Sequence, residues 1–534
     1  MAIITISNTG GNWNTAAAWV GGVIPTVADD VIATATSGPL SVTATGAVAK
    51  SVNFTNYINT FSLTNGTISI AGNLTLSAGM TITGTVASLL FTANATWTSN
   101  GKTWTGGYQV NTTTLTITLA DPAIIGGAVI HTGVGGVHTI NGSTLRFNGN
   151  VTASSGRVFA GTTVYRFTTA TTQAITGTFQ SDIVIIATGT VTLTSIIFSP
   201  ATNKTITYTS GIIPPGTGAL ALAPTGALIV TLNTSGMSWN TISNTGNNSI
   251  VLLSALNVTG TATLNNSPTL VGAFPLNAFN LIIGSSGGVL TLNNDINVTG
   301  TLSSGAATGT TINGAYNINA SGSVTVGTNW SGTAVLLYTG TGTFAGATAA
   351  SILRLNAFIN TSGATFGSFT YRTGTLTWTA IGTSTLGTMV LTLNTAPTMS
   401  VNCTGLVIPT ISMTLTSINT TFNGSQGFTI NNYSSLSSTS TKVTWQATNA
   451  YTINNSFTVT TTLAVSHTWE SSSPGTQYIV TLTNGATCDV AFMTVTDADS
   501  SLGATVWVYK PVSLTNTLNW KYLPTQPGTV SYTS

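Results

Sequence analysis

Apolar and hydroxyl side chains alternate along most of this sequence, and that alternation limits the chain to β-structure. Representative segments are Leu115–Leu119 (LTITL), Val191–Thr194 (VTLT) and Phe457–Thr460 (FTVT). Because successive residues of a strand face opposite sides of a sheet, a period of two predicts strands with one buried face. Gly, Asn and Ser interrupt these segments and supply turns. No stretch keeps a 3.6-residue apolar period between helix caps, so we expect essentially no helix.

Short motifs recur in the same order along the chain. Thr139–Gly142 (TING) returns as Thr311–Gly314, and Asn257–Thr261 (NVTGT) returns further along as Asn297–Thr301. The first spacing indicates a duplicated block, and the second indicates coils of about 20 residues. We therefore predict an all-β fold, a parallel β-solenoid of the right-handed β-helix type, with Asn, Thr and Ser stacked in ladders along it. Tandem β-sandwich modules are the alternative.

The repeats also divide the chain into four regions. We expect an N-terminal cap and first coils in residues 1–90, and a first solenoid block in residues 91–270. A second block, the duplicate of the first, covers residues 271–430, and C-terminal coils with a cap cover residues 431–534. Trp13 and Trp19 are expected to cap the N-terminal end, because bare strand edges invite polymerisation.

Charged residues are scarce, and this favours the solenoid. They make up 4 % of the chain, with 11 Lys and Arg and 9 Asp and Glu, against about 25 % in ordinary globular proteins. Equivalent side chains of a solenoid stack about 4.8 Å apart, so like charges would repel there and neutral hydroxyls and amides fit better. With a formal net charge of +2 and no basic cluster, we expect no nucleic-acid partner. The apolar runs are too short to cross a bilayer, so we expect no membrane insertion.

Both ends and one central segment of the sequence resemble a known group of proteins. The residues are Gly11–Pro25 (GNWNTAAAWVGGVIP) with Asp29–Ile32 (DDVI), Trp97–Trp104 (WTSNGKTW), and the C-terminal Ser473–Thr476, Val495–Asp499 and Asn519–Trp520. They resemble β-helical surface proteins of phages and bacteria, of the tail-fibre, tailspike and head-decoration type. The resemblance implies a virion or cell-surface structural protein, and it brings no catalytic motif.

The aromatic residues Trp97, Trp104 and Tyr108 lie in a Gly-rich stretch and are the candidate contact residues for a glycan or protein. Trp and Tyr stack on sugar rings and anchor protein interfaces. The alternative interpretation places them inside the coils, where they would stack on one another or close a bend.

Other constellations favour a structural role. Asp497 with Asp499, and Asp29 with Asp30, fit polar turns better than the acid pair of a glycosidase or a calcium loop. Lys102–Thr103 follows Gly101, but Thr96 stands where a phosphate-binding loop needs its first Gly. The remaining candidates for metal or thiol chemistry are too dispersed for a metal site or a disulfide framework, so we expect no cofactor; they are His131, His138, His467, Cys403 and Cys488.

Together these observations lead us to expect a non-enzymatic phage virion protein: a fibre, spike or head-decorating element that adheres to the host surface. Expected partners are other virion proteins, further copies of the chain (a homotrimer is one arrangement), and a host glycan or envelope protein. The N-terminus has no secretory signal pattern, so we expect assembly in the host cytoplasm and localisation in the virion. Two alternatives stay open: a bacterial secreted or surface adhesin whose leader has been removed, and a tailspike enzyme that cleaves glycans.

Overall fold

The structure is a computed structural model. It describes residues 2–531 except 133–135, 155, 215–217, 235–236, 285–287, 305–309, 327–328, 340–342, 347–351, 355–356, 361–364, 367–369, 372–374, 379–384, 387–389, 394–397, 402–405, 416–418, 438–439, 461–466 and 524–529. The described residues are almost entirely β-strands, stacked in parallel as a β-solenoid of about 18 turns. The predicted solenoid is therefore confirmed, and the sandwich alternative is wrong. One short 3₁₀ turn, η1 (Ala16–Ala18), interrupts the strands.

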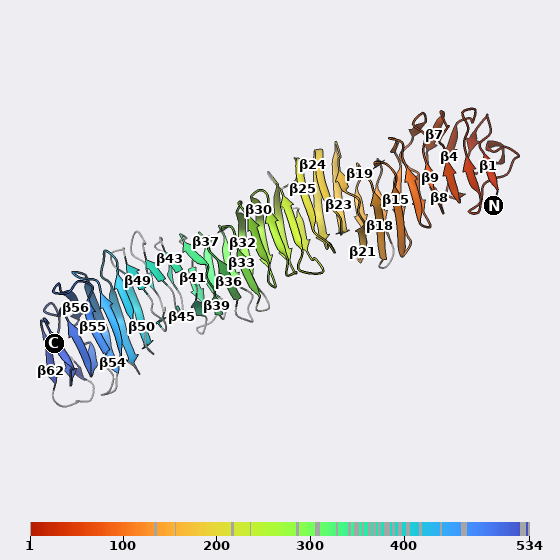
Figure 1. Ribbon diagram of the computed structural model, residues 1–534. Helices are drawn as coiled ribbons and strands as arrows, with labels where there is room; N and C mark the ends of the chain where they lie inside the picture. The colour runs from red at the N-terminus through yellow and green to blue at the C-terminus, as the bar shows by residue number, and fades with distance from the viewer. Residues whose placement is uncertain are drawn as a thin grey trace. The chain divides into compact units, whose positions relative to one another are not determined.

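The chain forms two compact units. Unit 1 comprises Met1–Gly260 with Gly272–Phe274, and unit 2 comprises Thr261–Val271 with Pro275–Ser534. The chain passes from one unit to the other at three points: within β30 (Leu256–Leu264), within β31 (Thr269–Gly272), and between Phe274 and Pro275. Within each unit, successive coils stack in chain order (Figure 1).

Unit 1 contains three long rows of parallel strands. The strands β23 and β24 are long enough to turn a corner, so each of them belongs to more than one row. The first row is β13 (Thr103–Trp104), β16 (Ala123–Ile125), β19 (Leu145–Phe147), β22 (Tyr165–Phe167), β24 (Ile183–Phe198), β25 (Lys204–Ile212), β27 (Ile229–Asn233) and β29 (Ser249–Leu252). The second row is β5 (Ala47–Ala49), β8 (Thr67–Ile70), β11 (Ser88–Phe91), β14 (Gly107–Val110), β17 (Val129–His131), β20 (Val151–Ala153), β23 (Thr172–Phe179) and β24.

The third row of unit 1 begins with the first strand of the chain. It consists of β1 (Ile3–Thr5), β3 (Asp30–Ile32), β6 (Ser51–Asn53), β9 (Leu74–Thr75), β12 (Ala95–Thr98), β15 (Thr114–Leu119), β18 (Gly136–Gly142), β21 (Arg157–Ala160), β23, β24, β26 (Ala219–Leu222) and β28 (Ser238–Asn244). A separate parallel sheet contains β2 (Gly11–Asn12), β4 (Leu40–Val42), β7 (Thr60–Leu63) and β10 (Thr81–Thr83).

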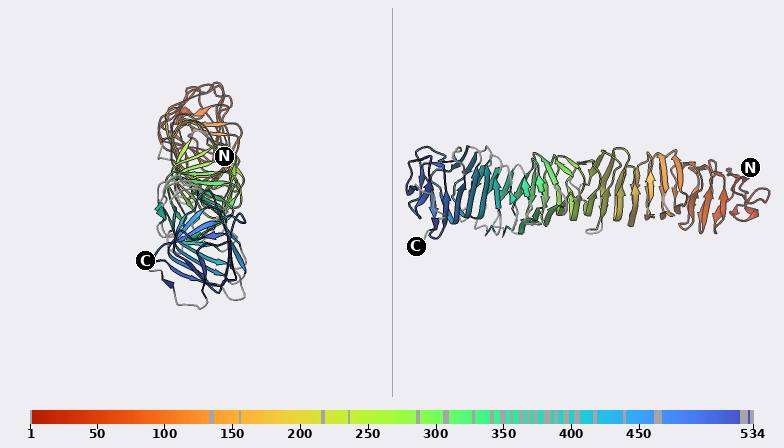
Figure 2. Two further views of the ribbon diagram at one scale, coloured as in Figure 1. Left: turned by 90° about the vertical axis from the view of Figure 1, so that its left-hand side faces the viewer. Right: turned by 90° about the horizontal axis from the view of Figure 1, so that it is seen from below.

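Unit 2 repeats the three-row plan, and its strands appear as ranks of parallel arrows in the right-hand view of Figure 2. One row is β33 (Val289–Leu292), β36 (Thr310–Gly314), β39 (Asn329–Ser331), β42 (Ile352–Arg354), β45 (Thr370–Tyr371), β48 (Val390–Leu393) and β50 (Val407–Leu415). Another is β32 (Leu276–Ile283), β35 (Thr301–Ser304), β38 (Ser323–Val326), β41 (Thr343–Gly346), β44 (Thr365–Phe366), β47 (Thr385–Leu386), β50, β52 (Thr429–Ser437) and β54 (Ala450–Thr460).

The third row of unit 2 also starts from β32. It continues through β34 (Ile296–Val298), β37 (Asn317–Ala320), β40 (Val335–Tyr338), β43 (Ala357–Asn360), β46 (Thr375–Trp378), β49 (Thr398–Val401), β51 (Thr420–Asn423), β53 (Thr441–Trp445), β55 (His467–Ser471), β58 (Met493–Thr496) and β61 (Ser513–Thr515). The last coils add β56 (Tyr478–Leu482), β57 (Thr487–Val490), β59 (Ala498–Asp499), β60 (Val506–Tyr509), β62 (Trp520–Leu523) and β63 (Val530–Ser531), which pairs antiparallel with β57.

The core of each unit is filled by the inward residues of most strands whose side chains the structure describes. In β19 and β22, for example, the outer two residues are buried and the middle residue faces out. Aromatic rings stack between coils: the ring centroids of Phe147 and Tyr165 lie 5.9 Å apart, and those of Phe159 and Phe179 lie 5.2 Å apart. This packing explains why alternating apolar residues suffice to build the fold.

Polar ladders run along the outside, as the sequence predicts. In unit 2, Asn297 Nδ2 donates to Asn277 Oδ1 at 2.7 Å, and Asn319 Nδ2 donates to Asn297 Oδ1 at 2.8 Å. The three residues occupy the same register position in successive coils. An amide both donates and accepts, so each Asn can bond the coil before and the coil after without any charge.

The recurring TING motif builds the same corner in both units. Gly142 has φ 91° and Gly314 has φ 122°, a region that disfavours residues with a side chain. The amide of Gly142 donates to Thr162 Oγ1, and the amide of Gly314 donates to Thr333 Oγ1. The motif therefore recurs because each corner needs the same left-handed backbone and the same hydroxyl in the next coil.

The first strand has its edge covered by the chain itself. Trp19 forms an antiparallel bridge with Ile6, and the amide of Val20 donates to the carbonyl of Thr5 at 2.9 Å. Trp13 and Trp19 are both buried, with ring centroids 5.1 Å apart, and Trp19 Nε1 donates to the Trp13 carbonyl. This arrangement is that of an edge protected against further strand pairing.

Candidate functional site

The three predicted contact residues lie inside the solenoid. Trp97, Trp104 and Tyr108 are 1 %, 0 % and 1 % exposed. The rings of Trp97 and Tyr108 lie 6.2 Å apart, and Trp104 Nε1 donates to the Gly107 carbonyl. These residues are therefore core residues, as the alternative interpretation has it, and we do not retain them as a contact site. Alternation already carried this signal, because Trp97 stands between two outward hydroxyl residues, Thr96 and Thr98.

Two histidines meet in the core beside Tyr108. His131 and His138 are both fully buried, with ring centroids 5.9 Å apart, and His138 Nε2 lies 2.7 Å from Tyr108 Oη. Desolvation lowers the pKa of His131 to about 4 and that of His138 to about 3, and the positive charge of Arg157 adds to the effect at His131. Both rings are therefore neutral near pH 7, and burial also raises the pKa of Tyr108.

No metal site emerges around the candidate ligands that the structure describes. No group of three or more His, Cys, Asp or Glu side chains comes together among the described residues. His467 lies in unit 2, where Thr441 Oγ1 is 2.8 Å from its Nδ1 and Trp469 Nε1 donates to its Nε2. Cys488 is buried with Sγ 3.7 Å from the Trp507 carbonyl, whereas Cys403 lies outside the described residues.

The candidate acid pairs are engaged in holding turns. Asp497 accepts hydrogen bonds from the Gly475 amide and from Asn516 Nδ2, and Asp499 accepts one from the Ser501 amide. In unit 1, hydrogen bonds from Thr26 and Ala2 lower the pKa of Asp29, and Asp30 pairs with Lys50 at 3.9 Å.

Lys102 lies in a tight turn and not in a phosphate-binding loop. Asn100 and Gly101 both have positive φ, and the Lys102 amide donates to the Ser99 carbonyl at 3.0 Å. Strand β13 follows directly, so no helix dipole is present to attract a phosphate.

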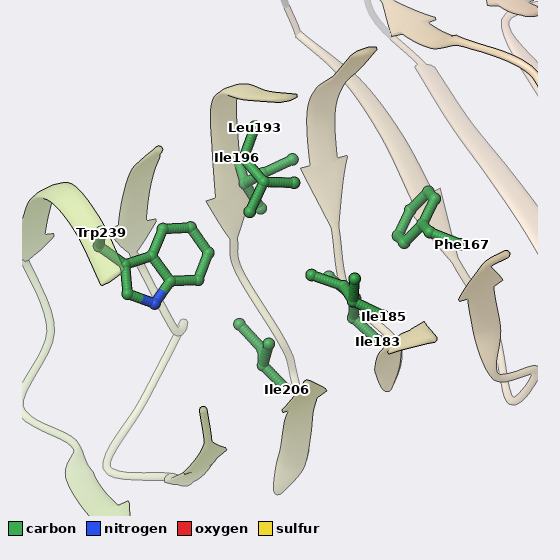
Figure 3. Close-up of a pocket in the computed structure, with 7 residues that line it drawn as sticks. All are labelled: Phe167, Ile183, Ile185, Leu193, Ile196, Ile206 and Trp239. Carbon is green, nitrogen blue, oxygen red and sulfur yellow. The ribbon is translucent and has the colours of Figure 1, made fainter. Parts of the chain in front are cut away.

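One apolar cavity lies in the core of unit 1 (Figure 3). Its volume is about 10 Å³, and the side chains around it point toward one another in Figure 3: Phe167, Ile183, Ile185, Leu193, Ile196, Ile206 and Trp239. The only polar atom among these side chains is Trp239 Nε1, which is buried and has no hydrogen-bond partner in the part of the chain that the structure describes. A ligand pocket normally combines an apolar lining with several convergent polar groups. This cavity lacks them, so we interpret it as a packing gap.

A pair of stacked arginines is the most unusual feature of the outer face. Arg146 in β19 and Arg166 in β22 are direct register partners in adjacent coils. Like charges placed opposite each other destabilise a sheet. In water the repulsion of two unit charges is about 1 kcal/mol at 4 Å. A chain that avoids charge almost everywhere thus stacks two of its five arginines.

Sequence reasoning missed this pair, although a signal was present. The tripeptide Leu145–Phe147 (LRF) returns one coil later as Tyr165–Phe167 (YRF). Since coils stack in register, a charge that recurs at the coil length recurs at the same place on the surface.

Comparisons with models of protein families, with curated proteins and with solved structures find no match for this chain. None of the helices in the described part of the chain has the length and apolar character needed to span a membrane.

Proposed function

We propose that the chain is a non-enzymatic structural protein of a phage particle, in the form of a fibre, a spike or a head-decorating element. The motifs at both ends of the sequence support the phage assignment by their resemblance to such proteins. In this proposal the protein attaches the particle to a host glycan or envelope protein, is assembled in the host cytoplasm and is carried in the virion. Its partners are other virion proteins and further copies of itself.

The observation that carries the structural role is the in-register stacking of neutral polar side chains, exemplified by the ladder Asn277–Asn297–Asn319. Such ladders bond each coil to the next and contribute rigidity. A catalytic site, by contrast, needs polar groups that face a ligand. Apart from Asp489, every acid of the chain either accepts a hydrogen bond from another residue of the protein or forms an ion pair with a lysine. These carboxylates are therefore engaged within the protein and do not face a ligand.

Labelling of particles tests the proposal. Antibody raised against the full chain should decorate one defined part of a phage particle in electron micrographs. Antibody that labels a bacterial surface and leaves particles unlabelled would favour the adhesin alternative. Release of new reducing ends from host polysaccharide by the purified chain would favour the tailspike enzyme and contradict the proposal.

A further inference from the structure

We propose that Arg146 and Arg166 form a binding site for the oxyanion groups of an acidic polysaccharide. This inference goes beyond the role in a particle and does not depend on it.

The side chains of Arg146 and Arg166 lie on the same outer face of unit 1. The residues on either side of each arginine are buried, so the arginine itself faces outward, and each is half-buried against its neighbours. Parallel strands lie about 4.8 Å apart. The two side chains therefore start from adjacent points of one surface and point the same way.

No acid in the described part of the chain forms an ion pair with either arginine. The described ion pairs join Lys50 to Asp30, Lys204 to Asp182 and Lys442 to Glu470. Asp182 is the nearest acid along the chain and precedes the register partner of Arg166, but Lys204 Nζ at 3.3 Å and the Thr205 amide at 2.7 Å occupy its carboxylate. In both arginines Nε is shielded from solvent and has no hydrogen-bond partner among the described residues.

The chemistry of the pair selects an oxyanion. Each guanidinium presents a planar fork of N–H donors that matches two oxygens of a carboxylate, sulfate or phosphate. An oxyanion placed between the two forks would accept from both and would cancel their mutual repulsion. A single neutral hydroxyl could do neither.

The surroundings favour a polysaccharide over a nucleic acid. Ile124 and Val184 are the register partners on either side of the pair, and Thr168 Oγ1 donates to Asn148 Oδ1 at 2.6 Å directly beside it. Nucleic acids bind proteins that neutralise several successive phosphates. Here two cations stand among aliphatic, hydroxyl and amide side chains, which suits a polymer whose sugar rings have apolar faces and hydroxyls and carry a single acidic group.

Binding of defined polymers to the immobilised full chain tests the proposal. We expect polygalacturonate and dextran sulfate to bind and neutral dextran not to bind. The variant Arg146→Gln/Arg166→Gln should bind the acidic polymers at least about tenfold more weakly, because the charge-assisted forks are lost. The matched control is Lys510→Gln/Lys521→Gln, which removes two exposed cations of unit 2. It lowers the net charge of +2 by two, as the arginine variant does. It should bind as the unmodified chain does.

A second variant separates the site from any effect on folding. Arg146→Lys/Arg166→Lys keeps both charges but loses the planar forks, and we expect it to lose most of the affinity. Sulfate stabilises folded proteins in general by exclusion from their surface, so the site is read from the difference between two proteins. Sulfate, compared with chloride at equal ionic strength, should raise the Tm of the unmodified chain more than that of the lysine variant. Unchanged polygalacturonate binding in either arginine variant, or tighter binding of oligothymidylate than of polygalacturonate, would overturn the proposal.

Discussion

Burial controls the chemistry of the few ionisable residues inside the solenoid. The pKa of His131 is lowered to about 4 and that of His138 to about 3, mainly because the core solvates a charged imidazole poorly. An unfolded histidine titrates at a pKa of about 6.5. The stabilising contribution of the two neutral rings is therefore complete above about pH 6.5 and is lost as the pH falls toward 4, since only the unfolded chain takes up protons in that range.

The variant His131→Phe tests this. Both ring nitrogens of His131 are buried and have no partner among the residues that the structure describes. The His131 ring lies 5.1 Å from that of Phe159, so a phenyl ring should fit among the same neighbours. We expect the free energy of unfolding, measured with urea, to fall less between pH 6.5 and 4.5 in the variant. The difference should be about 2 kcal/mol, because one pKa unit corresponds to about 1.4 kcal/mol. Equal losses in the two proteins would contradict the prediction, although His138 will leave a residual slope in both.

At the scale of the strands, the turns at the corners determine how many residues a coil contains, and the pairing within each row determines which residues of successive coils are register partners. In unit 2, one coil leads from Ile318 to its register partner Leu336, whereas a considerably longer coil leads from Ile453 to its register partner Leu482. The predicted coil length is thus one value in a range, because the turns absorb the extra residues while the strands keep their alternation. Alternation locates strands, but it cannot measure the turns between them.

A corner glycine gives a prediction at this scale. Gly142 ends β18 with φ 91°, and a Cβ there would lie 2.3 Å from the Leu119 carbonyl oxygen of the preceding coil. Gly142→Ala should therefore destabilise unit 1 by about 2 kcal/mol or more, through backbone strain and overlap. Gly226→Ala is the matched control, because a Cβ at Gly226 would meet nothing within 4 Å. We expect it to be neutral within about 1 kcal/mol. Equal Tm values for the two variants would contradict this account.

At the scale of the molecule, composition and periodicity were enough to predict the fold class, and the site was not predictable in the same way. Period-two alternation and motif repetition occur in many coils, so each coil adds evidence for the same fold class. The site depends on which coils are neighbours. Arg146 and Arg166 become a pair only when the segment between them is known to make one coil. The inward position of Trp97 did not depend on that knowledge, because its alternation with Thr96 and Thr98 already indicated it.

The low charge of the whole chain predicts an unusual indifference to sodium chloride. The described residues contain three ion pairs, each with partly exposed side chains, and such pairs contribute about 0–1 kcal/mol apiece. Ladders of amides and hydroxyls are not screened by salt. We expect the Tm to change by less than about 2 °C between about 20 and 500 mM sodium chloride, as measured by calorimetry. A larger change would point to electrostatic contributions that the described ion pairs do not explain.

The matching corners at Gly142 and Gly314 have an evolutionary consequence. Each coil makes its contacts with the coil before and the coil after, and the amide-to-threonine bond at these corners is satisfied by any neighbour that offers a hydroxyl at that point. Unequal recombination within the gene can therefore add or remove whole coils while the new neighbours still fit. The number of coils becomes a trait on which selection can act separately from the surface that those coils display.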